Sequence, residues 1–140
     1  YEVVAGIGHL WTDPDVDDDE DDDTIGLFVG SGAIKHTPSG ISLNIAGGDE
    51  EDGGSYGWAQ LAWEGDLISA GSTSFSIDYW DGSDFNVDGS DSDAWTIAAV
   101  QKIDDWSIEA YIAYRRYSYD DDGGSYKDGD LIFAGARWRF

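Results

Sequence analysis

The chain carries few side chains that could perform covalent chemistry. It has no Cys, and its only two His residues are His9 and His36. Ser31 lies between two Gly residues but lacks the G-x-S-x-G pattern that presents the nucleophile of a serine hydrolase. A triad would also need a His beside that Ser and an acid behind the His. We therefore expect no enzymatic activity and no cofactor.

Carboxylates are abundant and raise the question of a metal site. The alternating acids of residues 13–17 resemble the start of a calcium loop, but no Gly follows at the sixth position and no Glu at the twelfth. We expect no specific metal site, only diffuse attraction of cations. With 30 Asp plus Glu against 7 Lys plus Arg, the net charge of −23 repels phosphate backbones and argues against nucleic acid as a partner.

A second kind of chemistry is electrostatic and lies on alternating segments near the C-terminus. In residues 106–117 and 132–140, apolar side chains alternate with a set that includes charged residues. If the two segments pair antiparallel with Trp106 near Phe140, Glu109 faces Arg137. Two interpretations stay open: a basic ladder that acts on passing solutes, or a neutralised structural ion pair. If these segments belong to strands that enclose a channel, the residues that we expect to line its water-filled lumen are Asp78, Glu109, Tyr111, Arg115, Arg137 and Arg139.

These charges need strands to position them, and period-two alternation indicates strands throughout. The clearest run is 72–79, where Thr73, Phe75, Ile77 and Tyr79 alternate with polar residues. The pattern predicts an all-β, antiparallel chain of eight strands without helices. The eight runs are 1–11, 24–34, 41–46, 56–63, 72–79, 93–101, 106–117 and 132–140.

The connections alternate in length and charge. Acidic connections at 12–23, 47–54, 81–92 and 120–130 are interleaved with less acidic ones at 36–40, 64–71 and 103–105, which are shorter except that 64–71 equals 47–54 in length. In an up-and-down meander all the acidic connections lie at one end, where they form a negative rim. Short turns at one end, long loops at the other and an apolar outer band are typical of an outer-membrane β-barrel.

Aromatic residues near the expected strand ends fit the girdles of such a barrel. The alternative is that they form the core of a soluble β-protein. Low hydropathy does not argue against a membrane, because a spanning strand needs only about 9 to 11 residues, half of them apolar. The residues concerned are Trp11, Trp63, Tyr79, Trp95, Trp106, Tyr114, Trp138 and Phe140.

The C-terminal ten residues, LIFAGARWRF, resemble the last strand of Gram-negative outer-membrane proteins. In those proteins this ending is the signal read by the barrel assembly machinery, which would make Trp138 and Phe140 the assembly signal here. Residues 98–104, 109–117 and 133–137 are similar to the last three strands of general-diffusion porins of the alphaproteobacterial type.

The resemblance to porins implies a function and a location. It implies a channel for passive diffusion of small hydrophilic solutes and ions in the outer membrane, surrounded by lipid and lipopolysaccharide, and a homotrimer. By position, it also suggests that Arg115 and Arg137 belong to a basic cluster on the channel wall.

Two structures fit a chain of this length. Residues 1–140 form either a complete eight-stranded barrel with a structural or loop-mediated binding role, or the C-terminal part of a porin of about sixteen strands. Small inward residues would leave voids in a narrow barrel and favour the wider one. A start at Tyr1 without a leader-cleavage residue also favours a fragment. The small residues expected to point inward are Gly26, Gly30, Ser42, Asn44, Ser72, Ser74, Ser76, Thr96 and Ser107.

Overall fold

The computed structural model describes residues 1–12, 25–51, 53–85 and 87–140, with the side chains of residues 10–12 and 25 left aside. The described part is all-β apart from one 3-10 turn, η1 (Asp104–Trp106), and none of its helices is long and apolar enough to cross a membrane. The strands are β1 (Glu2–Thr12), β2 (Ile25–His36), β3 (Ile41–Glu50), β4 (Ser55–Ile68), β5 (Gly71–Ser83), β6 (Asp91–Ile103), β7 (Ile108–Asp121), β8 (Gly124–Ser125) and β9 (Gly129–Trp138).

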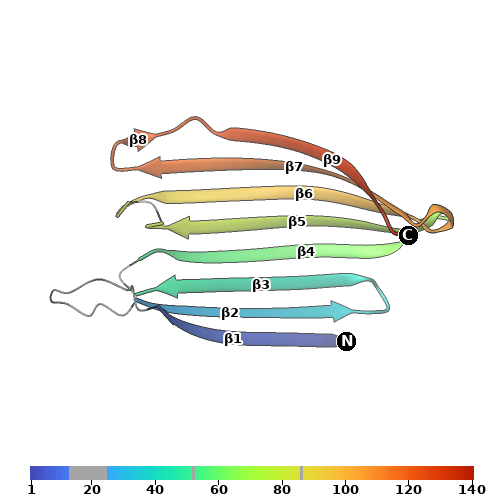
Figure 1. Cartoon of the computed structure of the whole chain (residues 1–140), viewed down its shortest axis with the longest axis horizontal. Helices are drawn as coiled ribbons and strands as arrows, with labels where there is room; N and C mark the ends of the chain where they lie inside the picture. Colours follow the sequence, from blue (N-terminus) through green and yellow to red (C-terminus); the bar gives the residue numbers. More distant parts are fainter. Residues whose placement is uncertain (13–24, 52, 86) are drawn as a thin grey trace.

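All strands form one antiparallel, up-and-down sheet (Figure 1). Each long strand pairs with the next one along the chain, and β9 pairs with β7 because the two-residue β8 sits within their connection. All eight predicted strands are confirmed. The segment predicted from Trp106 begins later, at Ile108, because Ser107 takes a left-handed conformation (φ 52°) that ends η1.

The strands are longer than their apolar alternation. Strand β3 continues through Gly47 and Gly48 to Glu50, and β5 continues to Ser83, because the backbone ladder needs no apolar side chain to extend. The connection predicted at 47–54 therefore shrinks to residues 51–54 and is not long. Both termini lie at the end of the sheet that holds connections 37–40, 69–70 and 104–107, which we call the short-turn end (Figure 1). The opposite end is the long-loop end.

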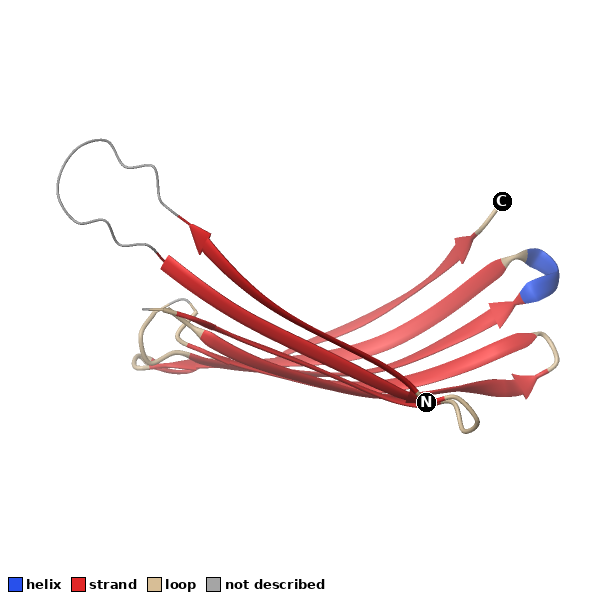
Figure 2. Cartoon of the chain, turned by 90° about the horizontal axis from the view of Figure 1, so that it is seen from below, coloured by secondary structure: helices blue, strands red, loops and turns tan. Residues whose placement is uncertain are grey.

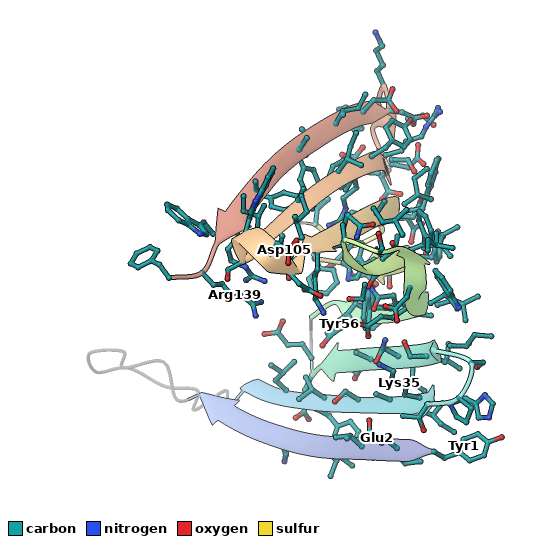
Figure 3. The ribbon with its side chains drawn as sticks, turned by 90° about the vertical axis from the view of Figure 1, so that its right-hand side faces the viewer. Tyr1, Glu2, Lys35, Tyr56, Asp105 and Arg139 are labelled. Atoms are coloured by element: carbon teal, nitrogen blue, oxygen red, sulfur yellow. The ribbon has the colours of Figure 1, made fainter. Side chains whose placement is uncertain are left out.

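The sheet is not closed. β1 pairs only with β2, and β9 only with β7, so each strand leaves one edge without a partner among the described residues. The sheet is strongly twisted, so that the two edge strands run in different directions (Figure 2). Seen along the strands, it follows an open arc (Figure 3).

This single layer has almost no interior. Among the described residues, Ala94 and Ala113 are the only buried apolar side chains, and none that is fully buried is large. The chain exposes 10176 Å², whereas a compact protein of this mass would expose about 7,100 Å². The excess of roughly 3,000 Å² shows how much surface lacks a covering layer.

The strand register separates the two faces of the sheet. One face, here called the apolar face, carries large exposed side chains from β3 to β9, with Ile77 51%, Ile112 54% and Ile132 70% exposed. A shallow depression of about 780 Å³ on it is lined almost entirely by apolar groups. The cross-strand neighbours on this face include Ile41, Leu43, Ile45, Leu61, Trp63, Phe75, Tyr79, Trp95, Ile97 and Tyr114.

The opposite face, here called the polar face, differs from expectation in two ways. Gly26 and Gly30 do not lie on it, because the unbroken β2–β3 register puts them on the side of Leu43 and Ile45. The polar face also holds large rings, since Trp58 and Trp80 are directly opposite each other. The remaining small residues on it include Ser42, Asn44, Ser74, Ser76 and Thr96.

Glycines let several of these rings lie against the backbone. A Cβ at Gly48 would come within 2.6 Å of Cε1 of Tyr56, which is its cross-strand partner. A Cβ at Gly82 would come within 2.5 Å of Cη2 of Trp80 on the same strand. Gly135 serves Tyr111 in the same way, with Cζ at 2.6 Å. Rings that cover glycines in this manner protect the ladder and stand less far out from the face.

Gly40 fixes the β2–β3 turn, and its replacement tests the fold. Its φ is +73°, and a Cβ there would overlap the Glu64 carbonyl oxygen, which belongs to the neighbouring strand. We predict that Gly40→Ala lowers the free energy of unfolding by about 2 kcal/mol. The measurement is urea unfolding of the full protein in mild detergent, followed by Trp fluorescence. Gly57→Ala is the control, because no atom lies within 4 Å of its Cβ position; equal losses in both variants would contradict this turn.

Candidate functional site

The polar face gathers all of the charged and polar residues proposed to line a lumen. Register places Asp78 opposite Thr96 and Thr96 opposite Arg115 on one row, and Glu109 opposite Arg137. Tyr111 is two residues from Glu109 on the same face of β7, and Arg139 reaches Glu109 from beyond the end of β9. The six residues come from three regions of the chain, namely β5, β7 and the β9 end.

Glu109 is the centre of an ion cluster at the short-turn end. Its Oε1 is 2.5 Å from Nη2 of Arg137, and its Oε2 is 3.4 Å from Nη2 of Arg139. The expected alignment of Trp106 with Phe140 gives the same register as the observed pair Ile108–Trp138. Because Glu109 is only 18% exposed while both guanidiniums are more than half exposed, the carboxylate orients two cations that remain open to solvent.

A second, similar cluster was not predicted from the sequence. Glu64 Oε2 is 3.0 Å from Nζ of Lys35, and Glu64 Oε1 is 3.3 Å from Nζ of Lys102. The Ser72 hydroxyl also donates to Glu64, at 3.4 Å. The partners are 29 and 38 residues from Glu64, so only the strand register brings them together. The sequence held one indication of this cluster: Lys35, Glu64 and Lys102 each take a polar-face position close to a short turn.

The two clusters form one feature, which we call the basic belt: Lys35, Glu64, Lys102, Glu109, Arg137 and Arg139. Lys102 links them, because it pairs with Glu64 through its ammonium and lies directly opposite Glu109 in the register. Figure 3 looks onto this end of the sheet, with Lys35 labelled on β2 and Arg139 beyond β9. The belt thus crosses the polar face from β2 to the β9 edge.

Arg115 does not join the other Arg residues, which corrects the expected ladder. It lies six residues from Glu109 on β7, a separation of about 20 Å along a strand. Its guanidinium lies over the Tyr117 ring, with Cζ 4.9 Å from the ring centroid, a cation–π contact. Arg115 Nε and the hydroxyl of its neighbour Thr96 are buried without a hydrogen-bond partner among the described residues. Arg115 therefore belongs to the middle of the face and Arg137 to the short-turn end.

The middle of the polar face is polar but carries little charge. A cross-strand row runs Asn44, Gln60, Asp78, Thr96, Arg115. The Asn44 amide donates to Gln60 Oε1 at 3.1 Å. Asp78 sits midway along β5. A shallow groove of about 350 Å³ adjoins this row, between β1 and β4 beside Trp58.

The long-loop end is strongly acidic. Within the ranges 49–51, 81–93 and 120–130 there are 13 carboxylates and a single cation, Lys127. The Tyr126 hydroxyl donates to Asp121 at 3.0 Å, and this hydrogen bond raises the pKa of the phenol. No group of three potential metal ligands gathers within the described ranges. The calcium-like run at 13–17 lies outside them.

The two residues proposed as an assembly signal lie together at the C-terminus. Trp138 ends β9 opposite Ile108, and its ring centroid is 6.0 Å from that of Phe140. Both side chains are highly exposed. Their reading by an assembly machinery stays a prediction.

The ion pairs of Glu109 should contribute modestly to the free energy of unfolding. Glu109→Gln leaves Arg137 and Arg139 without their shared carboxylate, and we expect a loss of about 0.5–1 kcal/mol because both guanidiniums are largely solvated. The measurement is again urea unfolding of the full protein. Asp105→Asn removes the same charge from the exposed η1 turn, and we expect it to leave stability unchanged. A loss in both variants alike would mean that net charge, and not the ion pairs, sets the effect.

The chain matches no protein-family model, no curated protein and no solved structure.

Proposed function

We propose that the chain is part of the wall of an outer-membrane porin, a water-filled channel through which small hydrophilic solutes and ions diffuse passively. The observation that carries this proposal is a single-layer sheet with one exposed apolar face and one charged face. If the sheet stood in water, its apolar face would expose far more area than the few hundred Å² that soluble proteins expose in one apolar patch. Lipid on one side and water on the other satisfies both faces.

The aromatic residues of the apolar face support a membrane setting. Trp95 contacts Tyr114, with ring centroids 5.2 Å apart, and Tyr79 lies directly opposite Trp95. On β6, Trp95 is eight residues from Ile103, which is in cross-strand register with Ile108 and Trp138. Eight residues span about 26 Å along the strand and about 20 Å in height at the usual tilt of barrel strands. This is close to the apolar band of about 25 Å between two aromatic girdles.

The open edges support a portion of a larger barrel. A membrane tolerates no unpaired strand edge, so β1 and β9 need strands from outside the described sheet or each other. On the polar face the guanidiniums of Arg137 and Arg139 are more than half exposed, as a hydrated lumen requires. In this proposal the long-loop end faces outward beside lipopolysaccharide, the chain inserts through the barrel assembly machinery, and the assembly is a trimer.

The alternative is that β1 and β9 pair to close a small eight-stranded barrel with a structural or loop-mediated role. The rings of Trp58, Trp80 and Tyr111 on the polar face favour this alternative, because they could fill a narrow interior. The two structures differ in whether water and solutes reach the middle of the polar face.

Adjacent residues on β5 provide the test. The chain has no Cys, so Ser76→Cys places a single thiol on the polar face and Ile77→Cys a matched one on the apolar face. We predict that the full protein opens stable channels in planar bilayers. A cationic, water-soluble thiol reagent should change the single-channel conductance of Ser76→Cys and leave that of Ile77→Cys unaltered.

Other results would point elsewhere. Channels that are absent, with both thiols unreactive, would support the closed small barrel. A protein that stays in water as a monomer and does not associate with lipid would overturn the membrane proposal altogether.

A further inference from the structure

We infer that the channel wall is electrically asymmetric along the strand axis and that it rectifies ionic current, passing more when the long-loop side is positive. This inference rests on the proposed channel function and adds a direction to it. It follows from where the chain places its few cations relative to its many carboxylates. No ligand or moving part is needed.

The cations are concentrated at one end of one face. Of the seven Lys and Arg, four lie in the basic belt at the short-turn end of the polar face, namely Lys35, Lys102, Arg137 and Arg139. Three carboxylates accompany them on that face: Glu64, Glu109, and Glu2, which stands opposite Lys35. Four positive and three negative charges give this end of the polar face a net charge of +1, and Asp66, Asp104 and Asp105 beside the short turns bring the whole short-turn end to −2.

At the long-loop end of the wall, carboxylates greatly outnumber cations. The 13 carboxylates and one Lys of residues 49–51, 81–93 and 120–130 sum to −12 at the long-loop end, and Arg116, which pairs with Asp128, brings this to −11. Between the two ends lies the row from Asn44 to Arg115, in which Asp78 and Arg115 are the only charged side chains and carry opposite signs. The wall therefore runs from a strongly negative long-loop end, through a neutral middle, to a short-turn end whose polar face carries +1 and whose total charge is only weakly negative.

Fixed charges of this kind select the mobile ions next to them. Cations enter easily at the negative long-loop mouth, and anions are less hindered at the short-turn mouth. When the long-loop side is positive, the field drives both kinds of ion toward the middle, where they accumulate and raise the conductance. The opposite polarity draws both out and depletes the middle.

Salt screening sets the conditions of the effect. The Debye length is about 30 Å at 0.01 M and about 3 Å at 1 M, so the wall charges control the lumen only in dilute salt. The rectification should therefore be present at low salt and vanish at high salt in the same channel.

The test is a current–voltage curve of the full protein in planar bilayers at 0.01 M and 1 M KCl. The orientation is fixed by biotinylating a Ser125→Cys variant at the long-loop end and adding streptavidin to one side. We expect the currents at opposite polarities to differ by at least about 1.5-fold in 0.01 M KCl and to be equal in 1 M KCl.

Three substitutions locate the cause. Lys102→Gln lowers the net charge of the short-turn end by one and should reduce the ratio, whereas Glu64→Gln raises it by one and should increase it. Lys127→Gln is the matched control, because it removes the same charge as Lys102→Gln but at the long-loop end, and it should not reduce the ratio. Equal conductance of all variants in 1 M KCl verifies that they fold alike.

The outcomes separate the two proposals. Channels with equal currents at both polarities in 0.01 M KCl would overturn the asymmetry while leaving the channel intact. A larger current with the long-loop side negative, or equal effects of Lys102→Gln and Lys127→Gln, would also overturn it. The absence of channels would overturn the proposed function, and this inference with it.

Discussion

A single layer of β-sheet cannot bury its own apolar side chains, and the rest of this structure depends on that constraint. The strands are held by long antiparallel ladders, which satisfy backbone hydrogen bonds without creating an interior. Ala94 and Ala113 are the sole buried apolar residues of the described chain. Any cover for Leu61, Ile77 and Ile112 therefore has to come from outside the sheet, and our proposal assigns that role to lipid.

The same geometry explains how the charges are arranged. Once the apolar residues occupy one face, every ion pair of the belt must form across strands on the other. Glu64 and Glu109 each hold two cations from residues remote in sequence. Such exposed pairs contribute little to stability individually, so their main consequence is to fix where positive charge stands on a chain that is otherwise strongly acidic.

The sequence predicts the fold well because period two is both a strand signal and a face signal. All eight long strands follow from it, and the Glu109–Arg137 register follows from aligning the two C-terminal segments. The prediction that Gly26 and Gly30 point inward was wrong because glycine has no side chain that indicates a face. The adjacent residues Phe28 and Val29 are both apolar but point to opposite faces, so they do not settle the orientation of β2. The predicted length of connection 47–54 was wrong because Gly47 and Gly48 continue strand β3 through backbone hydrogen bonds alone. The Glu64 cluster was missed because it depends on three strands in register, which no local pattern encodes.

The most direct test of the account asks what touches each face. Nitroxide labels at single Cys substitutions from residue 94 to 100, in the full protein in lipid vesicles, report collisions with oxygen, which concentrates in lipid, and with a water-soluble nickel complex. We predict that the collision rates alternate with period two. Labels at positions 95, 97 and 99 should collide mainly with oxygen, and labels at positions 96 and 98 mainly with the nickel complex. If labels at 95, 97 and 99 met neither reagent, a protein layer would cover the apolar face and the account would be contradicted.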